Sequence, residues 1–164
     1  MHFEVEQRFT AAPPDVIDLY TDPAFYELLR DLPRVGQPEV RDRVVNGHLI
    51  TMRVHYRFTA DLPTAATAVI DRDKLTWIEE TVYDVNAMTS SSQLLPDNYA
   101  DRLTAGATTT FAEDSATGGT RRSISADCKV RFPVVGGKVE GAIVSGLREH
   151  LADEAAVANR QLAE

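Results

Sequence analysis

Apolar and polar residues alternate along much of the chain, which is the pattern of β-strands that bury one face. The alternation begins over residues 2–10 and is most regular over residues 50–58, where every second residue is apolar. Strand-like segments also cover residues 38–45, 75–83, 88–95, 104–111 and 123–132. We therefore expect about seven strands.

Two short helices are predicted directly after the first strand. Pro13, Pro14 and Asp15 begin the first, and Asp22-Pro23 begins the second, which carries Phe25 and Leu29. Residues 62–73 have the character of a connector with one or two helical turns.

Asn46-Gly47 is a strong signal for a hairpin between two of the strands. A strict two-residue loop at this dipeptide would place Arg43 opposite Ile50 and put the apolar residues of the two strands on opposite faces. We therefore expect a longer loop or a bulge at this turn.

The only long helical pattern runs from Lys138 to about Leu162, a length of about 37 Å at 1.5 Å per residue. Its apolar stripe starts with Val139 and contains the expected cavity residues Ile143 and Leu147. The stripe also contains Gly146. Each glycine in a helix interior costs about 1 kcal/mol relative to alanine, so we expect close packing on the sheet or space for a ligand to compensate.

These elements predict an α+β fold in which residues 1–164 form a single domain. An antiparallel sheet with one apolar face needs a cover, and the long C-terminal helix is the element able to provide it. We therefore expect a helix-grip architecture, with a curved antiparallel sheet of about seven strands wrapped around the C-terminal helix and two short helices after the first strand.

Charge and composition limit the possible binding partners of the protein and its possible cellular location. The 164 residues include 17 Lys and Arg against 25 Asp and Glu, a net charge of −8, which repels nucleic acid and anionic lipid headgroups. No apolar run approaches the ~20 residues of a membrane helix, and the N-terminus lacks the pattern of an export signal. The single cysteine, Cys128, excludes an internal disulfide and is expected to be a small core residue. We expect a cytoplasmic protein without stable membrane insertion.

Sequence motifs for cofactors, metals or nucleophilic catalysis are incomplete. Gly136-Gly137-Lys138 is followed by Val139 rather than by the Ser or Thr of a phosphate loop. Ser145 has Ile143 and Leu147 at the positions where a nucleophile elbow has its two glycines. None of the four histidines has the spacing of a zinc ligand set. No metal or organic cofactor is expected.

Glu79 and Glu80 point to opposite faces of one strand, so one of them should face the long helix. If Trp77 and Tyr83 face inward, Glu79 does too. An inward carboxylate must be hydrogen-bonded, raised in pKa or engaged with a ligand. The alternatives are an ion pair, for example with Arg102, or exposure at an open end of the sheet.

His150 points almost the same way as the apolar stripe of the long helix, with Glu154 one turn further on. This places an imidazole and a carboxylate at the rim or floor of a cavity, where histidine can exchange protons. The alternative is a hydrogen-bonded helical histidine near the surface.

Three stretches, residues 75–84 (LTWIEETVYD), 96–103 (PDNYADRL) and 130–140 (VRFPVVGGKVE), resemble an uncharacterised, chiefly actinobacterial family of the START-like (SRPBCC) superfamily. The resemblance covers nearly the whole chain. It implies a sheet wrapped around a C-terminal helix, with apolar small molecules bound between them. Other superfamily members are polyketide cyclases and dehydratases, or co-chaperones.

We therefore expect non-enzymatic binding or carriage of a small hydrophobic or amphipathic molecule, such as a lipid. One alternative is a cyclase-like enzyme with Glu79 and His150 as acid and base. Another is a protein-interaction module with a vestigial pocket. The expected ligand-binding residues are Phe25, Leu29, Met52, Val54, Tyr56, Trp77, Glu79, Tyr83, Ile143 and Leu147.

Overall fold

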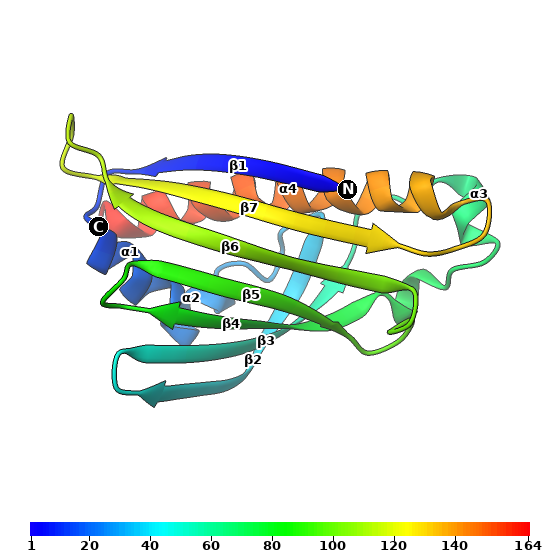
Figure 1. The fold of residues 1–164 in the computed structure, drawn as a ribbon, viewed down its shortest axis with the longest axis horizontal. Helices are drawn as coiled ribbons and strands as arrows, with labels where there is room; N and C mark the ends of the chain where they lie inside the picture. The colour runs from blue at the N-terminus through cyan, green and yellow to red at the C-terminus, as the bar shows by residue number, and fades with distance from the viewer.

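Seven antiparallel strands form one sheet in the computed structural model, which describes residues 1–164 (Figure 1). The spatial order of the strands is β1-β7-β6-β5-β4-β3-β2, so the first strand pairs with the last. Their bounds are β1 His2–Phe9, β2 Val35–Asn46, β3 Leu49–Phe58, β4 Thr76–Asp84, β5 Thr89–Pro96, β6 Leu103–Glu113 and β7 Thr120–Val130.

The helices begin where the turn and periodicity signals predict them, but α2 ends before Leu29, which was expected to belong to it. The two short helices after β1 are α1 (Pro13–Tyr20) and α2 (Pro23–Glu27), and each begins with a proline. The expected connector contains α3 (Thr64–Thr67) and a 3₁₀ turn, Arg72–Lys74. The long C-terminal helix α4 (Gly136–Leu162) begins two residues earlier than expected. None of the helices combines the length and the apolar character needed to span a membrane.

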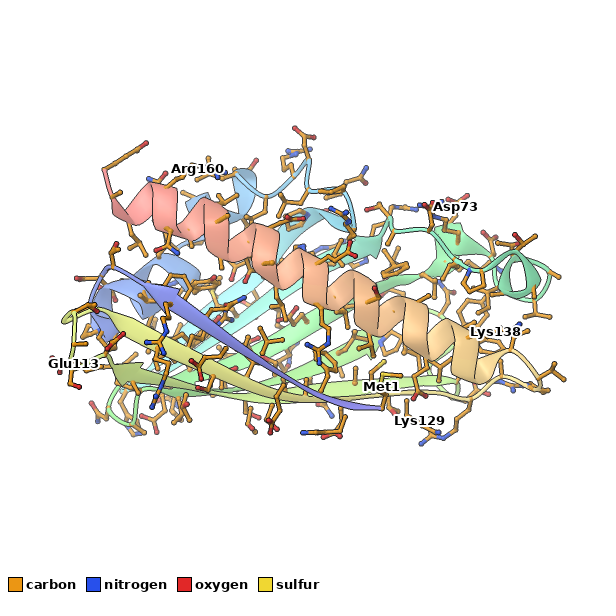
Figure 2. All side chains as sticks on the ribbon, turned by 90° about the horizontal axis from the view of Figure 1, so that it is seen from above. Met1, Asp73, Glu113, Lys129, Lys138 and Arg160 are labelled. Carbon is orange, nitrogen blue, oxygen red and sulfur yellow. The ribbon has the colours of Figure 1, made fainter.

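The sheet curves around α4, which confirms the predicted helix-grip architecture (Figure 1). The helix contacts β1 and β7 at one edge of the sheet and β2 at the other. Figure 2, in which Lys138 and Arg160 lie near the two ends of α4, shows the helix extending along the sheet. The short helix α1 also contacts α4, and it lies near the C-terminal end of the chain (Figure 1).

The core lies between the concave face of the sheet and α4. The alternation in β3 is confirmed, because all five of its predicted apolar positions from Ile50 to Phe58 are buried. Gly146 on α4 packs against the same strand, and a Cβ atom at Gly146 would lie 2.9 Å from Cε2 of Phe58. This contact explains one of the helix glycines, whereas a Cβ at Gly141 would meet nothing within 4 Å.

The β2–β3 hairpin differs from the prediction. The two-residue loop is Gly47-His48, because Asn46 still pairs with Leu49, and the irregularities lie further along, between Gly36 and Glu39 and between Val40 and Asp42. The predicted longer loop or bulge at Asn46-Gly47 is therefore wrong. Arg43 takes the position opposite Met52.

Two features make this register acceptable. The Arg43 guanidinium donates a hydrogen bond to the carbonyl oxygen of Thr21 at 2.7 Å, so its inward-facing charge has a partner. Val44 and Val45 stay exposed at the hairpin end of the edge strand, where no part of the core reaches them. The bulges then restore an inward-facing Val35 at the other end of β2.

Candidate functional site

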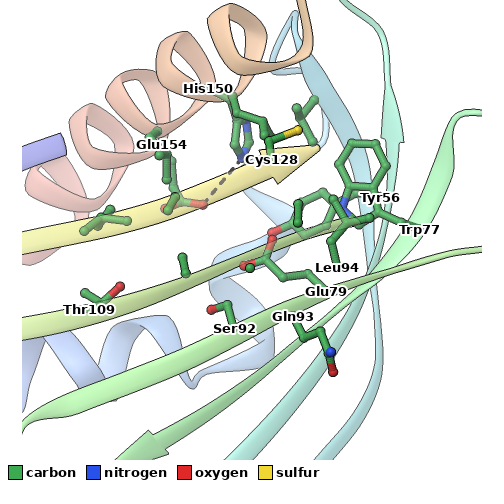
Figure 3. A pocket seen from close by; sticks show the side chains of 18 of the residues that line it. Tyr56, Trp77, Glu79, Ser92, Gln93, Leu94, Thr109, Cys128, His150 and Glu154 are labelled. Carbon is green, nitrogen blue, oxygen red and sulfur yellow. Dashed lines mark ion pairs between the residues drawn. The ribbon is translucent and has the colours of Figure 1, made fainter. Parts of the chain in front are cut away.

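A cavity of about 120 Å³ lies between the sheet and α4 (Figure 3). All seven strands contribute to its wall, together with α1, α2 and α4, and 15 of its 24 lining residues are hydrophobic. Alanines on β6 and β7, at positions 105, 107 and 126, line it where larger side chains would fill the space. The curved sheet and these small residues together leave room for a compact molecule.

Aromatic side chains form much of the apolar wall. Four of the five tyrosines of the chain and its only tryptophan, Trp77, line the cavity. The rings of Tyr56 and Trp77 pack with their centroids 6.3 Å apart, and the ring of Tyr56 also contacts the His150 imidazole at 5.9 Å. These side chains combine apolar area with polar atoms, a composition common in binding pockets.

A buried charged cluster occupies one side of the wall. Glu154 on α4 accepts from Nη1 of Arg122 at 3.4 Å and lies 3.5 Å from Nε2 of His150 (Figure 3). Arg122 also donates to Oε1 of Gln7 at 3.2 Å, and its guanidinium lies 4.4 Å from the ring centroid of Tyr20. Burial opposes ionisation of Glu154, but His150 and Arg122 outweigh it and hold the pKa of Glu154 below its ordinary value.

Glu79 is the second carboxylate of the cavity, and it forms no ion pair. It is enclosed by protein yet keeps part of its surface accessible because it borders the cavity. Burial and the charge of Glu154 raise the pKa of Glu79 above its ordinary value, with a partial offset from His150 and Arg122. The inward orientation predicted from Trp77 and Tyr83 is therefore confirmed.

The alternative partner considered for Glu79 is wrong. Arg102 pairs instead with Asp101 at 3.7 Å, and its guanidinium lies 5.4 Å from the ring centroid of Phe132. Glu80, on the opposite face of β4, forms an ion pair with Arg53 at 2.6 Å. The two adjacent glutamates thus have different environments because strand alternation separates them.

Three buried side-chain atoms have no hydrogen-bond partner within the protein: Oη of Tyr20, Nε of Arg122 and Nδ1 of His150. All three belong to residues of the cavity wall. A buried polar group without a partner costs about 1–3 kcal/mol, so such groups call for an explanation beyond stability. Their concentration here marks the cavity as the candidate functional site.

The structure brings half of the predicted ligand-binding residues to the cavity and places the other half in the surrounding core. The residues that border the cavity are Tyr56, Trp77, Glu79, Tyr83 and Leu147, together with His150. Those that are buried without bordering it are Phe25, Leu29, Met52, Val54 and Ile143. Phe25, for example, packs against Tyr20 and Tyr26, and those two tyrosines reach the cavity instead.

Arg122 is the main cavity residue that the sequence interpretation missed. The apolar residues of β7 alternate from Ile124 to Val130, and one step back along the same alternation reaches Arg122. A charged residue at an inward-facing position is itself a signal of a buried ion pair. The pairing of His150 with Glu154 could be anticipated, because residues four apart share a helix face.

Cys128 is buried, as expected of a small core residue, and it also borders the cavity (Figure 3). Burial raises the pKa of its thiol to about 11, so the thiol stays protonated at neutral pH and is a weak nucleophile. No group of three or more His, Cys, Asp or Glu side chains is arranged to hold a metal ion.

Comparison with known proteins identifies the family of the chain and its fold. The family described as a protein of unknown function, DUF2505, matches residues 4–162. No curated protein matches the chain.

Several solved structures share its fold at low sequence identity. TTHA0849 from Thermus thermophilus is 16% identical over 99% of this chain and 97% of that protein, with a TM-score of 0.67. A START superfamily protein from Mycobacterium smegmatis is 15% identical over 98% of both chains, with a TM-score of 0.59. The Zhui aromatase/cyclase from Streptomyces sp. R1128 is 16% identical over 97% of this chain and 88% of that enzyme, with a TM-score of 0.55. These likenesses show a START-like fold.

Proposed function

This chain belongs to the DUF2505 family of proteins of unknown function, and we propose that it binds a small, mainly apolar molecule in the cavity between the sheet and α4. The observation that carries the proposal is the cavity itself, with a largely hydrophobic wall that includes a few polar groups. Burial of apolar ligand surface supplies about 25 cal/mol per Å², and the polar groups orient the ligand. The START-like fold supports this location.

The size of the cavity sets the size of the ligand. The cavity measures about 120 Å³. An apolar cavity of about 150 Å³ in another protein holds benzene, so this one suits a molecule with about one ring. A larger ligand requires the sheet and α4 to move apart, or side chains to change rotamer.

Acid–base catalysis in the same cavity is the second candidate function. Glu79 has a raised pKa and borders the space that a substrate would occupy, and His150 faces the same space from α4. Two such groups can exchange protons with a bound molecule. Replacement of Glu79 by Gln and of His150 by Asn tests this candidate, because unchanged turnover of an identified substrate in both variants would contradict it.

A protein-interaction role has less support. The exposed large apolar side chains are distributed over several elements, and among them only Val44 and Val45 are adjacent in sequence. A contiguous exposed apolar patch of several hundred Å² would favour an interaction surface.

The binding proposal is tested by filling the cavity. Ala107→Leu places a larger side chain into the space, whereas Ala112→Leu adds the same atoms to the opposite face of β6. Saturable binding of 2-phenylethanol, followed by the fluorescence of Trp77, is expected in the natural protein and in Ala112→Leu and is expected to be lost in Ala107→Leu. Native mass spectrometry after gentle purification should show a bound species with the same dependence on the variants.

Equal binding of the probe by Ala107→Leu and the natural protein would contradict the proposal, because the ligand would then lie elsewhere. Urea unfolding of both variants provides the folding control. Ala107→Leu is expected to be at least as stable as Ala112→Leu, because it fills a void.

A further inference from the structure

The charged groups of the cavity differ in whether they already have an oppositely charged partner within the protein. Arg122 and His150 both face Glu154, so the basic groups of the wall share one carboxylate. Glu79 has no basic partner. The adjacent residue, Glu80, forms its ion pair with Arg53 on the other face of the sheet. Figure 3 shows Glu79 extending from β4 toward the space beneath α4.

The positive charge of Arg122 is balanced by Glu154, although its Nε atom has no hydrogen-bond partner. Its Nη1 atom is hydrogen-bonded to both Gln7 and Glu154, and the guanidinium lies over the rings of Tyr20 and Phe111, at 4.4 and 5.6 Å from their centroids. The side chain is 9% exposed. An anion in the cavity would meet two carboxylates and a guanidinium that is already paired, so the cavity disfavours negative charge.

The rest of the wall favours a positive charge. Tyr56, Trp77 and Tyr83 lie on β3 and β4, the strands around Glu79, and aromatic rings attract cations through their electron-rich faces. An unpaired carboxylate beside aromatic side chains has the chemistry that recognises an ammonium group attached to an apolar body. The volume of about 120 Å³ limits that body to about one ring.

We infer that the ligand of this cavity is a compact apolar amine, with its ammonium group on Glu79 and its hydrocarbon part against the aromatic wall. The inference rests on the proposed function and narrows it to a ligand class. The ammonium group of the ligand then pairs with Glu79, the cavity carboxylate that has no basic partner. The ion pairs among Arg122, Glu154 and His150 stay as they are.

Three probes of nearly equal size separate charge from shape: 2-phenylethylamine, 2-phenylethanol and phenylacetate. Their binding is measured by Trp77 fluorescence and by calorimetry at pH 8, where an aliphatic ammonium with a pKa of about 10 is still charged. We expect the amine to bind roughly 10- to 100-fold more tightly than the alcohol, the gain of a charge-assisted hydrogen bond. Phenylacetate is expected to bind more weakly than the alcohol.

Matched variants assign the preference to one residue. In Glu79→Gln the amine is expected to bind no more tightly than the alcohol. Glu80→Gln removes the same charge from the same strand but on the opposite face, and it is expected to retain the preference for the amine. Urea unfolding shows whether each variant is folded.

The outcomes separate this inference from the proposed function. Equal affinity for amine and alcohol in the natural protein, or a preference for the amine that survives in Glu79→Gln, would overturn the assignment of an amine. Binding of the alcohol that Ala107→Leu abolishes would still support the cavity as the ligand site. Failure of all three probes to bind would overturn both statements for ligands with one ring.

Discussion

Glu79 and Glu154 border the same cavity, yet their pKa values move in opposite directions. Both carboxyls are removed from bulk water, which disfavours the charged form. Glu154 has Arg122 and His150 within 3.5 Å, and these two groups compensate for the lost hydration. Glu79 has no such partner, and the charge of Glu154 adds to the cost of ionising it. The distance of each carboxyl group from Arg122 and His150 therefore decides whether its pKa is raised or lowered.

This difference predicts how stability depends on pH. Because the pKa of Glu79 is higher in the folded than in the unfolded protein, its ionisation opposes folding once the pH exceeds its unfolded value of 4.5. The penalty is absent below that pH, grows as the pH rises, and is complete above the folded pKa. Glu79→Gln is therefore expected to unfold at a higher urea concentration than the natural protein at pH 8, with the difference growing from pH 4 upward.

The contribution of Glu154 has the opposite sign, because its pKa is lowered, and it is lost as the pH falls below 4.5. This contribution is present in both proteins, and it changes with pH mainly below 4.5, whereas the penalty of Glu79 grows above that pH. Glu80→Gln serves as the control, because its ion pair with Arg53 lies on the other face of the sheet and is worth at most about 1 kcal/mol. A stability difference for Glu79→Gln that is independent of pH would contradict the assignment.

At the scale of the elements, two glycines of α4 have different surroundings. Gly146 lies where Phe58 of β3 approaches the helix, so the missing side chain allows close contact with the sheet. Gly141 has no atom within 4 Å of the position that a Cβ would take, and nothing in the structure explains it. Two glycines of one helix are thus expected to respond differently to the same substitution.

Gly141→Ala is expected to stabilise the protein by about 0.5–1 kcal/mol, because alanine has the higher helix propensity. Gly146→Ala is expected to destabilise it by about 1–3 kcal/mol, because the new methyl group would lie 2.9 Å from Cε2 of the fully buried Phe58 and must displace it. Urea unfolding monitored by circular dichroism measures both changes. Equal effects of the two substitutions would show that α4 does not pack on β3 as described.

At the scale of the whole molecule, the cavity exists because the sheet encloses α4 from both edges. Contacts of α4 with β1 and β7 on one side and with β2 on the other hold the two edges apart. The residues that line the space come from every strand and from three helices. Expansion of the cavity therefore requires a movement shared by several elements, rather than the opening of one loop.

This arrangement predicts a dependence of binding kinetics on ligand size. A one-ring probe is expected to associate at a rate proportional to its concentration. A ligand with two or three fused rings exceeds about 120 Å³ and is expected to show a rate that saturates with concentration, limited by expansion of the cavity. Stopped-flow fluorescence measures this directly, since Trp77 is the only tryptophan and lines the cavity. Identical concentration dependence for both ligands would show that no expansion is needed.

The sequence by itself determined the elements and their inward faces. The alternation over residues 50–58 and the helical periodicity after Lys138 are properties of adjacent residues, and the backbone turns them directly into faces of a strand or helix. The need to cover one apolar sheet face with the one long helix then indicated the helix-grip architecture. The same local rule placed Glu79 inward once Trp77 and Tyr83 were inward.

Only the tertiary structure decided which inward residues border the cavity and which pair with one another. Met52 and Tyr56 share a face of β3, yet only Tyr56 reaches the cavity. Arg122 meets Glu154 across 32 positions of sequence. The β2–β3 register places Arg43 opposite Met52, where its guanidinium donates a hydrogen bond to the carbonyl oxygen of Thr21. Periodicity describes neighbours along one element, whereas a cavity and a buried ion pair depend on the distances between elements, which long-range packing sets.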